Sequence, residues 1–158
     1  MERETTRHLV LYGEYELSVD DKNRMLVPSE IRRQIDPNRD GAAFFVVTGN
    51  DGRPWLYPER YYEELVSRDP GELTPDDEML AYDRINLGVI SRIEWDKQGR
   101  VLLPDRALKR AGIGKEVTLI GVRDHLELWA RADWEIEREA LFARRAEIVL
   151  KARQARKI

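Results

Sequence analysis

The chain contains one charged motif twice, and this duplication constrains the fold more than any other feature. The two copies read Asp20-Asp21-Lys22-Asn23-Arg24-Met25-Leu26-Val27-Pro28 and Asp96-Lys97-Gln98-Gly99-Arg100-Val101-Leu102-Leu103-Pro104. In both, an aspartate precedes an arginine by four residues, three apolar residues follow and a proline ends the run, with a constant offset of 76. A tandem repeat of this kind predicts two small modules with the same structure.

The sequence around the motif repeats as well. Thr48-Gly49 and Leu56-Tyr57 match Ile120-Gly121 and Leu128-Trp129 at an offset of 72, as expected if the first copy holds four extra residues between Asp36 and Phe44. We therefore divide the chain into a leader (1–13), a first module (14–61), a helical connection (62–89), a second module (90–133) and a C-terminal helix (134–158).

Each module is expected to contain four strands and one short helix. Tyr15, Leu17 and Val19 alternate with polar residues, which is typical of a half-buried strand. The charged motif then forms a tight turn, because Asn23 and Gly99 are residue types that readily adopt a positive φ. Strands are expected over 25–27, 44–48, 55–57, 117–120 and 126–129, and Pro28 is expected as the first residue of a short helix over 28–35.

Two further helical segments lie outside the modules. Thr74 is a candidate cap for a helix that Gly88 ends. From Asp133 to Arg156 the residues favour a helix, and Trp134, Leu141 and Ile148 recur seven apart, with Phe142 and Val149 widening the apolar stripe. We expect this stripe to pack against the body of the same chain; a partner subunit is the alternative.

Composition excludes several classes of protein. The 158 residues are 42% hydrophobic, which is enough for a buried core, and they include no cysteine, so disulfides and thiolate metal sites are impossible. The two histidines, His8 and His125, have no metal-ligand spacing, and no nucleophile-elbow, Walker or dinucleotide-binding motif occurs. We expect no enzyme activity, metal, cofactor or small-molecule substrate, and, since no signal peptide or membrane-spanning run is recognisable, a soluble intracellular protein.

Charge is distributed unevenly along the chain. The net charge is −3, which disfavours general attraction to nucleic acid. Acidic residues concentrate in 59–83, whereas the last twenty residues hold Arg144, Arg145, Lys151, Arg153, Arg156 and Lys157 against Glu139 and Glu147. Any surface that binds DNA must therefore be local.

The two charged turns are the candidate sites. Lys22 and Arg24 flank the first turn residue, and Lys97 and Arg100 flank the second. One interpretation is a solvated turn in which Asp20 and Asp96 merely pair with the arginines. We favour a double role, because a plain turn would accept many sequences: the aspartates orient the arginines, and the basic groups contact phosphates or guanine edges.

These residues resemble the MraZ family of bacterial regulators, which carry two SpoVT-AbrB type modules. The resemblance rests on Tyr12-Gly13-Glu14-Tyr15, on both charged motifs, and on Gly121 followed by Leu126-Glu127-Leu128-Trp129, and it covers roughly residues 12 to 135. It implies an α+β fold in which tandem swapped-hairpin β-barrel (AbrB-like) modules form an intrachain pseudo-dimer, with helices between and after the modules.

The resemblance also implies a function. It implies a nucleoid-associated cytoplasmic regulator that forms a ring of identical subunits and binds double-stranded DNA at G-rich direct repeats upstream of the division and cell-wall gene cluster. The family motif falls on Asp20 with Arg24 and on Asp96 with Arg100, and its basic tip on Lys22, with Lys97 shifted by one position. Asn23 replaces the usual glycine, Gly99 retains it, and Pro28 and Pro104 end the motifs.

Two other functions remain open. An AbrB-like antitoxin or protein-binding module would act through its C-terminal helix and would order that segment on a partner. A purely structural ring without a ligand would tolerate substitutions in both turns.

Overall fold

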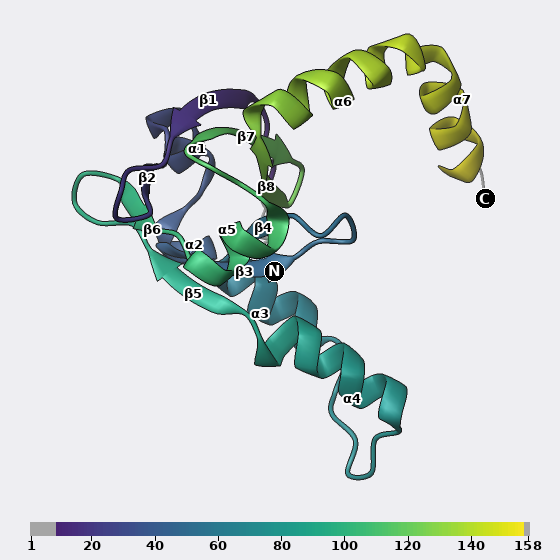
Figure 1. Cartoon of the computed structure of the whole chain (residues 1–158). Coiled ribbons are helices and arrows are strands. Elements are labelled where there is room, and N and C mark those ends of the chain that lie inside the picture. Colours follow the sequence, from purple (N-terminus) through teal and green to yellow (C-terminus); the bar gives the residue numbers. More distant parts are fainter. Residues whose placement is uncertain (1–8, 157–158) are drawn as a thin grey trace, which may run out of the picture.

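The computed structural model describes residues 9–156, shown in Figure 1. The strands are β1 (Glu14–Ser18), β2 (Arg24–Leu26), β3 (Ala43–Thr48), β4 (Pro54–Pro58), β5 (Ser91–Glu94), β6 (Arg100–Leu102), β7 (Glu116–Val122) and β8 (His125–Ala130). The helices are α1 (Ser29–Gln34), α2 (Pro37–Asp40), α3 (Glu59–Ser67), α4 (Asp77–Asp83), the π-helical turn η1 (Arg84–Gly88), α5 (Asp105–Ala111), α6 (Arg131–Ala143) and α7 (Arg145–Arg156). This mixture of antiparallel sheets and helices confirms the α+β class.

The two copies of the repeat pair with each other strand by strand. Six strands form one antiparallel sheet in the order β1-β7-β8-β4-β3-β5, and β2 pairs with β6 in a separate two-stranded ribbon. Strand β1 of the first copy lies against β7 of the second, with Tyr15 opposite Leu119, and β5 of the second copy lies against β3 of the first, with Phe44 opposite Ile93. Each copy therefore supplies an edge strand to the other, and neither can form its sheet alone.

One apolar core joins the two copies. The sheet contributes Phe44, Leu56, Leu119, Leu126 and Leu128, all of which are fully buried. The β2–β6 ribbon adds Met25 and Val101, and the following segments add Val27, Leu103 and, from α1, Ile31. Burying a side chain of this size stabilises the folded state by roughly 1.5–3 kcal/mol. Since both copies fill the same core, they unfold together.

The last residues of the expected leader pack against the second copy. Leu9 and Leu11 are buried, and Leu11 exchanges backbone hydrogen bonds with Arg123 at 2.7 and 2.9 Å. The chain passes so close to Gly121 that a Cβ atom there would lie 2.3 Å from the backbone nitrogen of Tyr12. Both copies have glycine at this position for lack of space: at Gly121 the backbone of residues 11–12 occupies it, and at Gly49 the Trp55 side chain does. Residues 1–8, including His8, lie outside the described residues.

Two helix starts differ from the sequence-based prediction. Pro28 precedes α1 rather than begins it, because its ψ angle of 144° is extended, and Pro104 stands in the same position before α5 with a ψ of 125°. Their carbonyl oxygens still accept the first helical hydrogen bonds, as residues at an N-cap do. The cap of α4 is Asp76 rather than Thr74, since the Asp76 carboxylate accepts the Met79 N–H at 2.8 Å. Gly88 ends η1, as predicted.

The C-terminal segment forms two helices instead of one. At Arg144 the backbone leaves the helical region (φ −108°, ψ 12°), so α6 and α7 meet at a bend. The start of α6 is held on the body: Trp134 packs edge-on against Trp129 at 5.2 Å between ring centroids, and Arg138 pairs with Glu14 at 3.0 Å. Helix α7 buries none of its residues.

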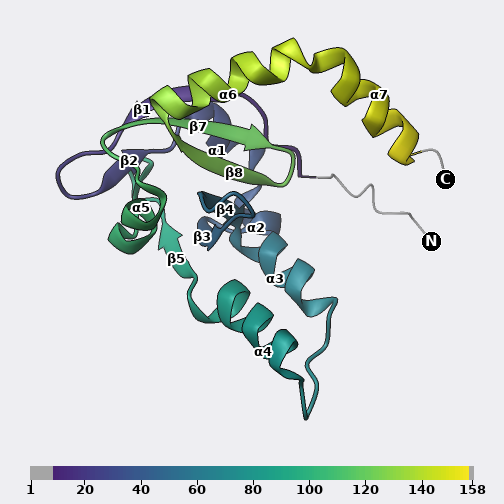
Figure 2. The ribbon, with the colours of Figure 1, turned by 45° about the vertical axis from the view of Figure 1, so that its right-hand side comes forward.

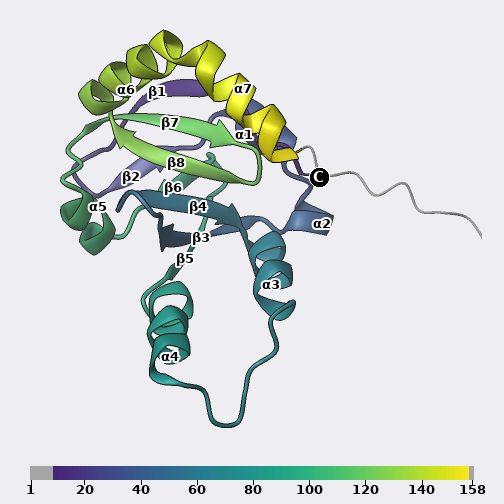
Figure 3. The same ribbon diagram turned by 90° about the vertical axis from the view of Figure 1, so that its right-hand side faces the viewer.

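The connection between the copies forms a projecting arm. Helix α3 leaves the sheet, a loop follows, and α4 with η1 returns to β5 (Figure 2). At the base of the arm the Tyr62 hydroxyl donates a hydrogen bond to the carbonyl oxygen of Asn86. Figure 3 shows the arm below the sheet, while α6 and α7 pass over the opposite end of the molecule.

Candidate nucleic-acid interface

The first charged turn is built around the carboxylate of Asp20. Its Oδ1 accepts the backbone N–H groups of Lys22 and Arg24 at 2.9 and 2.8 Å, and its Oδ2 accepts the Arg24 Nε–H at 3.1 Å. Asn23 has a φ of 63°, so the left-handed conformation predicted for the turn residue is confirmed. One aspartate thus fixes both the backbone of the turn and the direction of the arginine.

The second turn repeats this arrangement. Asp96 Oδ1 accepts the N–H groups of Gln98 and Arg100, each at 2.9 Å, and Oδ2 accepts the Arg100 Nε–H at 3.3 Å. Gly99 has a φ of 82°. The backbone hydrogen bond from the arginine is the main cause that lowers the pKa of Asp20 and of Asp96 below the usual value. Both aspartates are therefore charged at neutral pH, and the predicted ion pairs are confirmed.

The two turns lie on one side of the molecule because β2 and β6 pair with each other. The N–H of Val27 donates to the Gly99 carbonyl at 2.8 Å, and the N–H of Leu103 donates to the Asn23 carbonyl at 2.8 Å. Each turn is therefore held in place by the other copy. The four predicted basic residues, Lys22, Arg24, Lys97 and Arg100, all lie on these two turns or at their ends.

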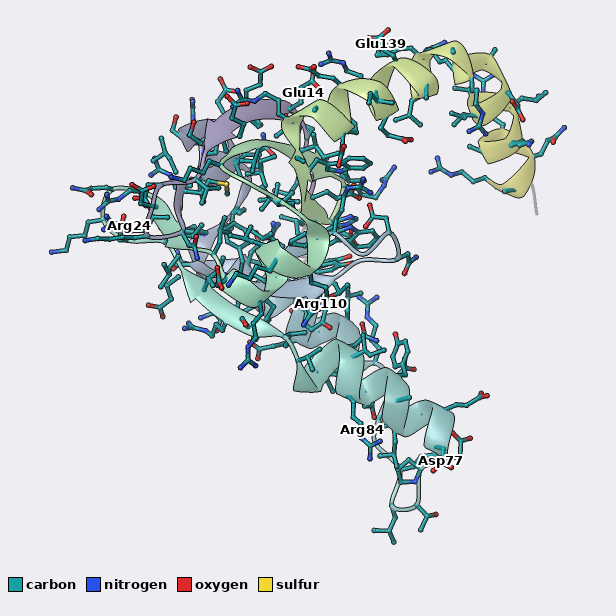
Figure 4. All side chains as sticks on the ribbon, in the orientation of Figure 1. Glu14, Arg24, Asp77, Arg84, Arg110 and Glu139 are labelled. Atoms are coloured by element: carbon teal, nitrogen blue, oxygen red, sulfur yellow. The ribbon has the colours of Figure 1, made fainter. Side chains whose placement is uncertain are left out.

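The outward side of the ribbon combines arginine with exposed leucine. Arg24 is opposite Leu102 and Leu26 is opposite Arg100, and residues opposite each other in an antiparallel pair share a face. Met25 and Val101 between them point into the core. We call Arg24, Leu26, Arg100 and Leu102 the ribbon face. Figure 4 labels Arg24 at this edge of the body, away from both the arm and the C-terminal helices.

Leu26 and Leu102 are candidates that the sequence analysis missed. Their side chains are 47% and 59% exposed and lie together on the same face of the ribbon. The alternation of buried Met25 and Val101 with their neighbours is the signal that could have identified them. The ribbon face can therefore offer apolar contacts beside two guanidinium groups.

The basic groups of the turns differ in how they are neutralised. The Arg24 and Arg100 side chains are each 36% exposed and form ion pairs only with their own aspartates among residues 9–156. The ammonium groups of Lys22 and Lys97 are exposed and form no ion pair within the same residues. Asp21, next to Lys22, pairs with Lys115 instead. The turns thus present four cations to the solvent, two directed by aspartates and two without a partner in the described chain.

A second charged cluster surrounds the buried His125 at the start of β8. Its Nδ1 lies 2.8 Å from Asp124 Oδ1 and its Nε2 lies 2.9 Å from Glu127 Oε2, while its ring stacks on Trp55 at 4.1 Å. Burial by itself lowers the pKa of His125, but the hydrogen bonds with Asp124 and Glu127 outweigh it and raise the pKa to about 9. The sequence analysis considered His125 only as a metal ligand, and its structural role was missed.

Other kinds of site are not formed by the described residues. Within residues 9–156, no three or more His, Asp or Glu side chains are grouped so that they could share a metal ion. In the same part of the chain, every helix is too short or too polar to span a lipid bilayer. The two turns and the ribbon face therefore remain the strongest candidate.

Comparison with known proteins gives a consistent result. The family described as "MraZ protein, putative antitoxin-like" matches residues 90–156. A protein of Clostridium tetani is 36% identical over 126 residues, which cover 78% of this chain and 83% of the relative. Similar proteins of Pediococcus pentosaceus (35%, 78% of this chain and 82% of the relative) and Acetivibrio thermocellus (32%, 80% and 85%) also match. All three are named "Transcriptional regulator MraZ".

The chain has an internally duplicated α+β fold with two matched basic turns, and it is similar over most of its length to regulators of this name. The chain is therefore a transcriptional regulator and not an enzyme. Within that class, the chain belongs to the MraZ family.

Proposed function

We propose that this regulator binds double-stranded DNA through the ribbon face and the two charged turns, with Lys22, Arg24, Lys97 and Arg100 in contact with the nucleic acid. The observation that carries the proposal is the repetition of the same aspartate-directed arginine on one side of the molecule. A two-stranded ribbon fits the major groove of DNA. Two turns of equal geometry on such a ribbon are suited to two neighbouring base steps.

The chemistry of each group supports a distinct contact. A guanidinium can donate two hydrogen bonds to O6 and N7 of guanine, which suits a G-rich operator. Because each aspartate accepts from Nε and from the backbone, the terminal nitrogens of Arg24 and Arg100 have no partner in residues 9–156. The exposed ammonium groups of Lys22 and Lys97 suit phosphates. Leu26 and Leu102 suit thymine methyl groups.

The operator and the assembly form part of the same proposal. The operator would be the G-rich direct repeats upstream of the division and cell-wall gene cluster, and a ring of identical subunits in the nucleoid would bind them together. A few cations on a chain of net charge −3 bind weakly alone, whereas several linked subunits gain from a high effective concentration. The reciprocal pairing of β1 with β7 and of β5 with β3 supports a swapped-hairpin barrel and the module boundaries 14–61 and 90–133.

Replacing both directed arginines tests this proposal. In the variant with Arg24→Ala and Arg100→Ala, we expect operator affinity to fall by about 100-fold or more, since each guanidinium–guanine contact contributes about 1–3 kcal/mol. A mobility-shift titration with the upstream DNA of this chain measures the loss. Solution mass and circular dichroism should not change, because both side chains are partly exposed and lie outside the core.

The matched control carries Arg60→Ala and Arg68→Ala, which removes two positive charges from α3 and its end, far from the ribbon face. This control should bind the operator within about twofold of the unmodified chain, since it keeps the turns. If the ribbon variant binds as tightly as the control at physiological salt, the ribbon face is not the DNA-binding surface.

A further inference from the structure

The arm carries a surface that the described chain does not cover. Helix α4 and the π-helical turn η1 contain no buried residue. A helix of this length is marginal in water without tertiary contacts. Met79, Tyr82, Leu87 and Val89 are large apolar side chains that are 40% to 64% exposed. Met79 and Tyr82 are three residues apart and so share a face of α4. This combination is typical of a helix that packs against another surface.

The charge of the arm is entirely negative near its tip. Residues 69–83 contain six carboxylates and no lysine or arginine: Asp69, Glu72, Asp76, Asp77, Glu78 and Asp83. Asp76 caps α4, while Asp77 and Glu78 are exposed in its first turn. Met79 and Tyr82 therefore lie among carboxylates near the tip of the arm, whereas Leu87 and Val89 lie beyond Arg84, closer to the body.

An open groove with the opposite character lies at the other end of the molecule. It has a volume of about 580 Å³ and lies between α6, α7 and the strands β1 and β7. Its apolar lining comes mainly from the stripe predicted to pack against the body of the chain, together with Ile120 of β7; the stripe residues are Trp134, Leu141, Phe142, Ile148 and Val149. That packing is incomplete, because Phe142 remains 65% exposed.

The groove is bordered by positive charge. Arg145 lines it and has no ion pair within residues 9–156, unlike Arg138, which pairs with Glu14. Helix α7 carries Arg145, Lys151, Arg153 and Arg156 against a single carboxylate, Glu147. In specific protein interfaces, opposite charges around an apolar contact fix the register of the two surfaces and exclude wrong partners.

We propose that the acidic arm of one copy of this chain docks in the basic groove between α6, α7 and the β1–β7 edge of the next copy. The inference rests on the ring that forms part of the proposed function, and it names the two surfaces that would join its subunits. The arm supplies Met79 and Tyr82 to the apolar lining, and its carboxylates face Arg145 and the cations of α7.

The positions of the two surfaces show that the arm of one chain can reach the groove of another copy but not its own groove. The arm and the C-terminal helices lie at opposite ends of the molecule in all ribbon views, and Figure 4 places Asp77 and Glu139 at these two ends. A chain cannot fill its own groove with an arm that points away from it. A contact between two different surfaces of identical subunits is heterologous, and it generates a ring when the rotation closes.

Charge reversal on each surface tests the docking. One variant carries Asp77→Lys and Glu78→Lys on the arm, and the other carries Arg145→Glu and Arg153→Glu on α7. We expect each variant alone to lose the high-mass species of the unmodified chain, with an apparent dissociation constant raised at least about tenfold. A one-to-one mixture of the two should recover the mass, because reversed arms then meet reversed grooves. Light scattering at low salt measures all three samples.

The control carries Glu30→Lys and Glu94→Lys, which reverses two exposed carboxylates outside both surfaces. It should keep the mass of the unmodified chain. If both reversed variants also keep that mass, the docking is wrong while the ring stands. If each variant is monomeric and the mixture stays monomeric, the two surfaces do not contact each other.

DNA binding is measured separately from assembly, by titrating each variant with a single operator repeat. Binding of each variant to a single repeat should be unchanged, since the ribbon face is intact. If the unmodified chain is itself a monomer over the whole concentration range, both the ring and the docking are wrong, and single-repeat binding still tests the ribbon face. Circular dichroism confirms that each variant is folded.

Discussion

The two copies of the repeat place a cation at the same position, but they use different residues. Arg53 of the first copy and His125 of the second correspond at the offset of 72. The Arg53 guanidinium lies 3.6 Å from the ring centroid of Trp129 in the second copy. His125 lies 5.2 Å from the ring of Tyr57, the residue that corresponds to Trp129 in the first copy. Each copy therefore places a cation on an aromatic ring of the other.

The difference between these two residues shows what the position requires. Arginine keeps its charge in any protein environment, and Arg53 pairs with Asp51 at 3.3 Å and more distantly with Asp133 at 3.9 Å. Histidine titrates near neutrality, and here two carboxylates, Asp124 and Glu127, hold its proton. Both copies therefore place a positive charge against an aromatic ring where β4 and β8 pair, and both surround it with carboxylates. The histidine of the second copy depends on its carboxylates to remain charged, whereas the arginine does not.

The largest expected effect concerns His125. With a folded pKa of about 9 against 6.5 in the unfolded chain, charged His125 contributes about 3 kcal/mol that is fully present below pH 6.5 and is lost as the pH rises through 9. We expect the free energy of unfolding to fall by about this amount between pH 6 and pH 10, relative to His125→Gln. Urea titrations of both proteins at each pH measure the difference.

The variant His125→Arg converts the second copy to the first and serves as a control. Its stability should not decrease relative to His125→Gln over the same range, because an arginine does not titrate there. Parallel stability curves for the unmodified chain and His125→Gln would show that folding does not raise the pKa of His125.

The two charged turns also share a backbone conformation but differ in the side chains that surround it. Asn23 donates its side-chain amide to Asp105 at 3.2 Å, at the start of α5. Gly99 is buried beneath Arg32, and a Cβ atom there would lie 2.8 Å from the Arg32 guanidinium. At the offset of 76, Arg32 corresponds to Leu108, so only the second turn has an arginine above it.

A smaller effect is expected when Gly99 is replaced by asparagine, the residue of the first turn. Asparagine tolerates the φ of 82°, but its Cβ would displace Arg32 from the Val27 carbonyl, to which Arg32 Nε donates at 3.2 Å. We expect a loss of about 1 kcal/mol in the free energy of unfolding, the lower end for overpacking. Urea midpoints measure it.

The same substitution in an Arg32→Ala background separates the causes. Without the guanidinium above the turn, Gly99→Asn should cost much less, and the double-mutant cycle gives the coupling directly. An equal cost in both backgrounds would mean that backbone strain at Gly99, and not Arg32, makes glycine necessary.

The features that the sequence predicted correctly are local. The aspartate-arginine pairs and the positive φ of Asn23 and Gly99 follow from residues at most four positions apart, and the structure confirms both. The strand pattern was also predictable, since alternation and the repeat reinforce each other. The DNA-contacting role of the four basic residues stays a prediction.

The features that were missed depend on contacts between distant residues. The ring on which His125 stacks belongs to Trp55, seventy positions away, so no local pattern identifies His125 as a buried cation. The cap of α4 was assigned to Thr74 because both Thr74 and Asp76 are residue types that can cap a helix. The path of the backbone decides between them, and it brings the Asp76 carboxylate to the N–H of Met79. The exposure of Leu26 likewise depends on the pairing with β6.

The smallest effect is expected for Asn23→Gly, which restores in the first turn the residue of the second. Glycine relieves the φ of 63° but increases the freedom of the unfolded chain, so these backbone contributions nearly cancel, to within about 0.5 kcal/mol. The hydrogen bond to Asp105 is solvent-exposed and is replaced by water. Operator affinity should stay within about twofold, because Asp20 still directs Arg24. A larger loss of affinity with unchanged stability would mean that the Asn23 side chain itself contacts DNA, and the two turns would then differ in function as well as in support.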